Sequence, residues 1–346
     1  AIVIMNGEEP LLDVAFPYVT GTRAGLFEGC LGVITPDGRS IIITSALEET
    51  SARGSRAEVL TYRTAQDRKD IATDLMKGFR KVGFNGQGIV HNNFLEVQRL
   101  AANAELVDAS KGLEAARLIK DREEVERVRK ACHIASRVAD EIPSVLREGM
   151  KEYEAAAELE YRMTKRGASG TAFSTNASFG ASSAEPHHGA EDISLNEGDT
   201  ALFDFGCKVE GYCSDITRTF FFGEPRDWQK RMYQVVTEAQ QAALRVIRAG
   251  VNGKDVDAAA RAVIDASEFK DLMVHSTGHG LGLSVHDGGR LAPNYDFPLK
   301  AGMVVTVEPG VYIRGKGGVR IEDDVLITED GYDMLTDADK GMRVVR

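Results

Sequence analysis

The hydrophobic positions in the first third of the chain follow two different periods. Short β-branched runs, the pattern of strands, surround two stretches, 65–80 and 92–102, whose apolar residues are spaced as on one face of a helix. A hairpin is expected at 31–44, where a Pro-Asp-Gly turn separates two apolar runs. Alternating strands and helices predict a small α/β domain with a mixed sheet covered by helices, and we place it at residues 1–111.

Residues 112–346 form the second expected domain, which begins with helical spacing and then turns to strand-like runs. After a short amphipathic helix near 110–120, longer helices are expected at 121–147, 150–166, 225–248 and 253–267. Pro143 should kink or break the first of these. The last two would cover the outer face of a curved sheet, which makes the fold class α+β with a smaller α/β domain in front.

Two strand-like stretches of this domain share one pattern, in which each of two apolar arms carries an acidic residue. In 302–324 the acids are Glu308 and Glu322, on either side of a Gly-rich turn; in 198–222 they are Asp204 and Asp215. A glycine precedes the first acid by six positions in both stretches, a weak repeat that suggests two similar half-domains facing one another. Buried carboxylates are costly unless they are paired or bind a metal, so the four together indicate a cation site.

Three of the seven histidines, His275, His279 and His286, fall within twelve residues between the two stretches. Carboxylates with an imidazole are ligands for Mn²⁺, Co²⁺, Fe²⁺ or Zn²⁺. Four carboxylates carry too much charge for one divalent ion, which favours two ions roughly 3.5–4 Å apart. A zinc helix of the HExxH type is excluded, because Ser276 stands where that motif needs glutamate and three nearby glycines disfavour a helix.

With their neighbours, these residues resemble the pita-bread metallopeptidases (peptidase family M24). The matching motifs are D-F-G, S-D-I-T-R-T, G-H-G-x-G-x-x-x-H, E-P-G and G-V-R-I-E, in that order. Within the family the chain is similar to the Xaa-Pro branch, which comprises prolidase and aminopeptidase P. The resemblance implies a curved antiparallel sheet covered by helices, a creatinase-like N-terminal domain in which 16–21 forms a strand and turn, and two divalent ions, Mn²⁺ or Co²⁺ first and Zn²⁺ or Fe²⁺ as alternatives. The implied ligands are Asp204, Asp215, His279, Glu308 and Glu322, with Asp215 and Glu322 bridging.

The family mechanism assigns further roles to this set. Two ions would ionise a shared water, and Glu308 would pass its proton to the leaving nitrogen. His286 and His187 would donate to the developing oxyanion or to that nitrogen. His188, beside His187, is expected to be an exposed turn residue. The other implied substrate contacts are His275, facing the substrate, and Arg290, capping the free carboxylate of proline.

Side chains two positions apart on a strand share a face, and this adds two supporting residues. Thr217 should accompany Asp215 and hold its carboxylate. Arg320 should accompany Glu322 and neutralise excess carboxylate charge near the metals, and we also count it among the substrate-binding residues. The alternative is that each only faces a cross-strand neighbour. The sequence departs from the family where His286 is followed by Asp287-Gly-Gly in place of the commoner Glu-x-Pro.

The expected activity is hydrolysis of a small peptide before proline. Arg290 and the short N-terminal region favour Xaa-Pro dipeptides, and aminopeptidase P acting on longer peptides is the alternative. An M24-like hydrolase or lyase of a non-peptide amide, and a non-enzymatic binding module, are the hypotheses from other classes.

Composition narrows the expected partners. A formal net charge of −11 argues against nucleic acid. No apolar run is long enough for a membrane span, and the start of the sequence lacks a basic region typical of a signal peptide. Four cysteines at no ligand-like spacing predict free thiols and a cytoplasmic protein. The family resemblance also implies a homodimer.

Overall fold

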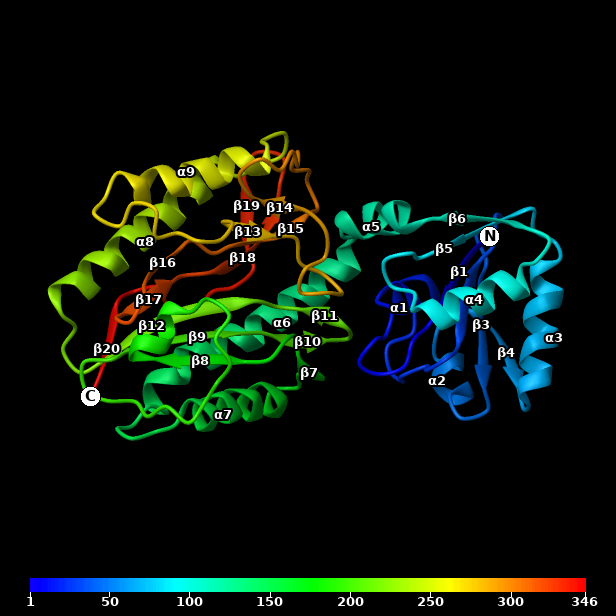
Figure 1. Cartoon of the computed structure of the whole chain (residues 1–346), viewed down its shortest axis with the longest axis horizontal. Helices are drawn as coiled ribbons and strands as arrows, with labels where there is room; N and C mark the ends of the chain where they lie inside the picture. The colour runs from blue at the N-terminus through cyan, green and yellow to red at the C-terminus, as the bar shows by residue number, and fades with distance from the viewer. The chain divides into compact units, whose positions relative to one another are not determined.

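The computed structural model describes all 346 residues and divides into two compact units. The N-terminal unit is Ala1–Ala116 and the C-terminal unit is Arg117–Arg346. The division falls within helix α5 (Ser110–Leu118) (Figure 1).

The N-terminal unit is built on a six-stranded sheet with the order β4-β3-β2-β1-β5-β6. Pairs β1–β2 and β2–β3 are antiparallel, whereas β1–β5, β3–β4 and β5–β6 are parallel. The strands are β1 (Ile2–Met5), β2 (Leu31–Ile34), β3 (Ser40–Ser45), β4 (Glu58–Tyr62), β5 (Lys81–Phe84) and β6 (Glu105–Asp108). The expected mixed sheet and the hairpin at 31–44 are therefore confirmed.

Helices cover both faces of this sheet because its strands are apolar on both sides. Ile41 and Ile43 belong to the core under two of the helices, and Ile42 belongs to the core on the opposite face. The helices are α1 (Ala15–Thr20), α2 (Glu49–Arg53), α3 (Ala65–Met76) and α4 (His91–Leu100).

Segment 16–21 is helical, so the expected strand and turn there were wrong. Pro17 lies in the first turn of α1, where its missing N–H costs no helical hydrogen bond. Gly21 has φ +71° and ends the helix, its N–H donating to the carbonyl of Pro17.

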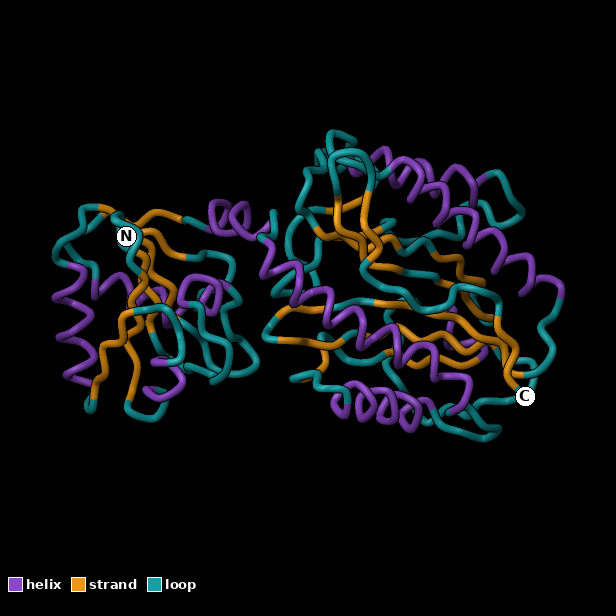
Figure 2. Tube along the Cα trace, turned by 180° about the vertical axis from the view of Figure 1, so that it is seen from behind, coloured by secondary structure: helices purple, strands orange, loops and turns teal.

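The C-terminal unit contains the four longer helices that the spacing predicts, α6 (Arg122–Glu141), α7 (Glu152–Lys165), α8 (Asp227–Val246) and α9 (Gly253–Asp265). Asp121 caps α6: its side chain accepts from the N–H of Glu124, and the side chain of Glu124 accepts from the N–H of Asp121. The helix ends before Pro143, where a single 3₁₀ turn, Ile142–Ser144, takes over. Figure 2 shows the helices flanking the strands of this unit.

The larger sheet of the C-terminal unit has the order β20-β12-β9-β8, and a second sheet has the order β15-β18-β19. All strand pairs in this unit are antiparallel except β12–β20. The strands of these two sheets are β8 (Asn176–Phe179), β9 (Thr200–Phe205), β12 (Ile216–Phe222), β15 (Val304–Val307), β18 (Asp323–Ile327), β19 (Tyr332–Met334) and β20 (Arg343–Val345). The short strands are β7 (Gly170–Thr171), β10 (Cys207–Val209), β11 (Tyr212–Cys213), β13 (Gly278–His279), β14 (Arg290–Leu291), β16 (Gly310–Ile313) and β17 (Gly317–Arg320).

Two hydrophobic cores divide this unit into layers. One core joins α6 and α7 to β8, β9 and β12, and the other joins α8 and α9 to β15, β17 and β18. Figure 1 shows the two helix pairs on opposite sides of the strands. Since side chains alternate along a strand, residues between the core positions point away from the helices, toward the other layer.

The acidic stretch 198–222 forms the expected paired arms. β9 and β12 are antiparallel, and Glu210 and Gly211, both with positive φ, form the turn between β10 and β11. The stretch 302–324 is a hairpin interrupted near its middle: β15 pairs with β18 and β16 pairs with β17. Glu308 and Glu322 lie in the interruption, where neither belongs to a strand.

The four cysteines are buried free thiols, as predicted. None of the helices combines the length and the apolar character that crossing a bilayer requires.

Candidate active site

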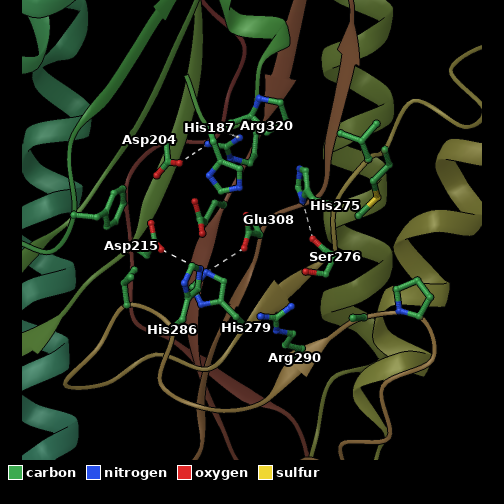
Figure 3. A pocket seen from close by; sticks show the side chains of 18 of the residues that line it. His187, Asp204, Asp215, His275, Ser276, His279, His286, Arg290, Glu308 and Arg320 are labelled. Carbon is green, nitrogen blue, oxygen red and sulfur yellow. Dashed lines mark hydrogen bonds and ion pairs between the residues drawn. The ribbon is translucent and has the colours of Figure 1, made fainter. Parts of the chain in front are cut away.

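A cleft of about 800 Å³ lies in the C-terminal unit, and every expected ligand and substrate residue lines it (Figure 3). Strand alternation explains why the acids reach it. On β9, Phe203 and Phe205 pack under α6 and α7, so Asp204 between them points the other way. Val305 and Val307 likewise pack under α8 and α9, which directs Glu308, one residue further, away from the helices.

Three candidate ligands form a tight cluster at the floor of the cleft. Ligand atoms of Asp215, His279 and Glu322 all lie within 4.8 Å of one another. The Nε2 atom of His279 is 3.7 Å from Oδ2 of Asp215 and 3.3 Å from Oε1 of Glu308. Asp204 lines the same cleft, so the structure brings all five predicted ligands to one place.

The floor holds oxygen atoms that the protein itself does not satisfy. Oδ1 of Asp204 and Oδ1 of Asp215 are buried and have no hydrogen-bond partner. An unpaired buried carboxylate oxygen is costly, and a divalent cation is the group that removes this cost for several carboxylates at once. The donor set therefore fits a centre of divalent ions.

The electrostatics of the floor agree with this. Burial, and next the carboxylate of Glu322, raise the pKa of Asp215 well above its usual range. Burial likewise raises the pKa of Glu322 strongly and that of Glu308 to about 8. Burial and the neighbouring His286 lower the pKa of His279 to about 3, which keeps its ring neutral and able to bind a metal.

Thr217 supports a different carboxylate from the one expected. Its hydroxyl donates to Oε2 of Glu322 at 2.5 Å and not to Asp215. Thr217 pairs with Asp204 across the β9–β12 ladder, and its face meets the interrupted hairpin, where the N–H of Glu322 donates to the carbonyl of Thr217. The assignment of Thr217 to Asp215 was wrong because the single hydroxyl proton is donated to the acid on the facing segment.

Arg320 joins several of these groups. Its guanidinium pairs with Asp204, donates to Oγ1 of Thr217 at 2.9 Å, and donates to the hydroxyl of Tyr312 at 2.8 Å. Arg320 is 2% exposed, so its charge acts at close range on the floor of the cleft. Its ion pair with Asp204 offsets part of the carboxylate charge in the cleft.

Tyr312 was not anticipated from the sequence. Its hydroxyl lies 2.7 Å from Nε2 of His275, whose Nδ1 faces the carbonyl of Ser276 at 2.8 Å. Both ring nitrogens of His275 are thus engaged within the protein, although the ring lines the cleft. Gly310 makes room for the tyrosine, since a Cβ there would lie 2.4 Å from its hydroxyl oxygen, but nothing in the sequence pattern marks this contact.

A second residue missed from the sequence is Asp324, in β18, two positions after Glu322. Its Oδ2 accepts from the N–H of Asp215 at 2.9 Å and from the thiol of Cys132 at 3.2 Å. Burial raises its pKa to about 8. Asp324 fixes the backbone of Asp215 and so helps to aim that carboxylate.

The rim of the cleft carries His187, His286 and Arg290, all exposed. The ring of His286 contacts that of His279, with centroids 4.3 Å apart and planes at 82°. Arg290 pairs with His279 across β13 and β14. Figure 3 shows His187 and Arg290 on opposite sides of the carboxylates.

His188 is not the exposed turn residue that was expected. Its side chain is 7% exposed, and its Nε2 lies 2.7 Å from Oε2 of Glu152, a fully buried residue at the start of α7. The same carboxylate accepts from the N–H groups of Phe179 and Glu191. Glu152 thereby anchors both ends of the loop that carries His187.

Comparisons with known proteins give a consistent result. The sequence matches Metallopeptidase family M24 over residues 126–329 and the Creatinase/Prolidase N-terminal domain over residues 3–119. A protein named Xaa-Pro dipeptidase from Pyrococcus furiosus is 35% identical, over 93% of this chain and 91% of that protein.

Solved structures resemble the whole chain. An X-Pro aminopeptidase from Thermotoga maritima has a TM-score of 0.93 at 33% identity, covering 99% of this chain and 97% of that one. An Xaa-Pro dipeptidase from Bacillus anthracis has a TM-score of 0.92, also at 33% identity, covering 99% and 94%. The expected pita-bread fold with a creatinase-like N-terminal domain is confirmed, and the chain belongs to metallopeptidase family M24.

Proposed function

We propose that the chain is a metal-dependent peptidase that hydrolyses the peptide bond before proline in Xaa-Pro dipeptides. The observation that carries the proposal is the convergence of Asp204, Asp215, His279, Glu308 and Glu322 on the floor of one cleft, with Arg290 at its rim. Relatives named Xaa-Pro dipeptidase, which match over more than nine tenths of the chain, support the substrate class.

The five convergent residues would hold two divalent ions, and Mn²⁺ or Co²⁺ suits four carboxylates and one imidazole. When bound, such ions polarise the scissile carbonyl and lower the pKa of water. Asp215 and Glu322 would hold the ions together with His279, since the ligand atoms of these three residues form the tight cluster. Asp204 would be aimed by its ion pair with Arg320.

Glu308 is the proposed proton carrier. It lies at the interruption of its hairpin, and its Oε1 accepts from the hydroxyl of Thr306 at 3.1 Å. Glu308 lines the cleft with its Oε1 3.3 Å from Nε2 of His279, and its ionised carboxylate would take a proton from the attacking water and release it to the leaving nitrogen. Xaa-Pro bonds need this delivery, because the leaving proline nitrogen must be protonated to depart.

The rim residues would contact the substrate. His187 and His286 are exposed to the cleft and can donate to the carbonyl oxygen as it gains charge. The guanidinium of Arg290 can bind the free carboxylate of a C-terminal proline with two hydrogen bonds. This contact favours dipeptides over longer substrates.

Aminopeptidase P activity, the release of the first residue from longer Xaa-Pro peptides, is the second candidate. The high structural similarity to the Thermotoga maritima X-Pro aminopeptidase favours it. The two candidates differ in whether the substrate ends at proline or continues beyond it, so Arg290 is the residue on which the distinction depends.

The test is a comparison of hydrolysis rates for an Xaa-Pro dipeptide, an Xaa-Pro-Yaa tripeptide and Met-Ala-Ser, with Mn²⁺, Co²⁺ or Zn²⁺ added. Cleavage restricted to the dipeptide, and lost after chelation, is the expected result. Faster cleavage of the tripeptide would identify an aminopeptidase P instead. Cleavage of Met-Ala-Ser alone would overturn the Xaa-Pro assignment.

We also propose that the protein acts as a homodimer in the cytoplasm. The family resemblance supports the dimer, and four buried free thiols are in keeping with a reducing compartment. Light scattering on the purified chain measures the oligomeric state directly.

A further inference from the structure

The ten residues between β13 and β14 connect two important histidines. His279 ends β13, and His286 lies seven positions later in the loop with its ring against that of His279. The loop returns to β14, where Arg290 pairs with His279. The shape of this loop therefore sets the position of His286 relative to the candidate metal ligand.

Asp287 holds the loop together from inside. It is 2% exposed, and its N–H donates to the carbonyl of Gly280 at 2.8 Å. Its carboxylate accepts from the N–H of Leu283 at 3.2 Å through Oδ2 and from Nε of Arg117 at 3.0 Å through Oδ1. Asp287, the residue directly after His286, thus contacts both the start and the middle of the loop.

The glycines around His279 make room for this carboxylate. A Cβ at Gly282 would lie 2.2 Å from Oδ2 of Asp287, and a Cβ at Gly280 would lie 1.8 Å from the carbonyl oxygen of Gly288. Gly288 and Gly289 have φ near +75° and +72°, which lets the chain turn toward β14 directly after Asp287. The Gly-rich segment and the Asp-Gly-Gly segment therefore pack directly against each other.

Arg117 connects the loop to the framework of the C-terminal unit. The side chain of Arg117 is 10% exposed, and the residues after it run beside β15: the N–H of Lys120 donates to the carbonyl of Gly302 at 2.8 Å, and Ile119 forms a bridge with Met303. Lys120 is also buried and adds a second positive charge near Asp287. The carboxylate is therefore fixed from outside the loop.

We propose that Asp287, held by Arg117, is a positioning residue that aims His286 over the candidate metal centre. This rests on the proposed function, because it assigns Asp287 a part in the same reaction. Asp287 does not line the cleft, and its carboxylate contacts Leu283 and Arg117 and no group that would react. Its role is to keep the loop in the one shape that places His286 against His279.

The first test uses Asp287→Asn, which keeps the shape of the side chain and removes its charge. At saturating Mn²⁺ we expect kcat for an Xaa-Pro dipeptide to fall about 10- to 100-fold, the usual effect of losing a group that orients an active-site residue, with KM changed less than about threefold. Arg117→Met should give a loss of similar size. The double variant should be no worse than either single one, because both changes break the same contact.

The second test asks whether Asp287 acts through His286. In a His286→Ala background, Asp287→Asn should lower kcat less than about twofold, because the residue to be positioned is gone. If the two losses multiply, Asp287 affects only general stability and the proposal fails. It also fails if Asp287→Asn leaves kcat unchanged.

A readout without turnover separates this proposal from the proposed function. In ¹⁵N-histidine NMR spectra, Asp287→Asn and Arg117→Met should shift the ring signals of His286 and His279. The matched control is Glu96→Gln, which breaks the Arg68–Glu96 pair of the N-terminal unit and should leave these signals in place. Unshifted signals in a folded Arg117→Met protein would overturn the proposal even if no Xaa-Pro substrate were cleaved.

Discussion

The floor and the rim of the cleft are built in opposite ways. On the floor, other groups of the protein hold the carboxylates. Thr217, itself bonded to Arg320, donates to Glu322, and Asp324 accepts from the N–H of Asp215. On the rim, the side chains of His187, His286 and Arg290 are exposed and donate to no other side chain of the protein. The floor is organised before anything binds, whereas the rim keeps its donors free for a substrate.

This difference predicts that changes on the floor act through metal affinity, and changes on the rim through the substrate. The largest effect is expected for Asp215→Asn, which removes a candidate bridging ligand. We expect activity to fall at least about 1000-fold and calorimetry to show loss of Mn²⁺ binding, since two ions would no longer share their charge. Asp37→Asn, at an exposed site of the N-terminal unit, is the control and should bind metal normally.

Arg290→Ala tests the rim. Loss of a charged hydrogen-bonding partner should raise KM for an Xaa-Pro dipeptide about 10- to 100-fold while kcat and metal affinity stay near wild type. An Xaa-Pro amide, which lacks the carboxylate, is the matched substrate and should show almost no change. Equal effects on both substrates would show that Arg290 does not read the carboxylate, and would remove the main reason to favour dipeptides.

Thr217→Val tests the hydrogen bond that orients the carboxylate of Glu322. The hydroxyl that donates to Glu322 is lost while the shape is kept, and we expect roughly tenfold weaker Mn²⁺ binding with little change in KM. Thr237→Val, which removes a hydroxyl bonded within α8, should not alter metal binding. If Thr217→Val bound Mn²⁺ as tightly as wild type, Glu322 would be held by its other contacts alone.

The smallest effect expected is a pH dependence of metal stabilisation. Burial raises the pKa of Glu308 to about 8, so without metal the folded state keeps a proton that the unfolded state releases. This carboxyl's contribution to stability is present below about pH 4.5 and is lost as the pH rises toward about 8. A cation binds the ionised carboxylate, so its affinity for the folded protein increases over the same pH range. The rise in Tm on adding Mn²⁺ should therefore be several degrees larger at about pH 8.5 than at about pH 6.

Thermal unfolding of wild type and Glu308→Gln across this range makes the measurement. The variant has no titrating carboxyl at that position, so its metal-induced rise in Tm should depend less on pH. A rise that is independent of pH in wild type would show that Glu308 is already ionised in the folded protein.

The fold and the floor were largely predictable because they depend on periodicity. Core residues alternate with Asp204 on β9, and Val305 and Val307 of β15 lead up to Glu308, so the sequence pattern points both acids away from the helices. Helix α1 (Ala15–Thr20) was missed, because six residues give too little periodicity to separate a helical turn from a strand.

Contacts between segments that lie far apart in the sequence were not predictable in the same way. Thr217 supports Glu322, 105 positions away, and His188 meets Glu152 under the loop of His187. Such pairs depend on which strands cross and how closely, and neither composition nor spacing carries that information. Tyr312 and Asp324 were missed for the same reason.

The two layers of the C-terminal unit meet at the acids, with Asp204 and Asp215 on one layer and Glu308 and Glu322 on the other. Divalent ions bound there would link the two layers, whose facing carboxylates would otherwise repel one another. Chelation should therefore lower the local stability of this region as well as the activity. Protease sensitivity and hydrogen exchange should rise together along β12, β17 and the segment around Glu322, while the N-terminal sheet stays protected.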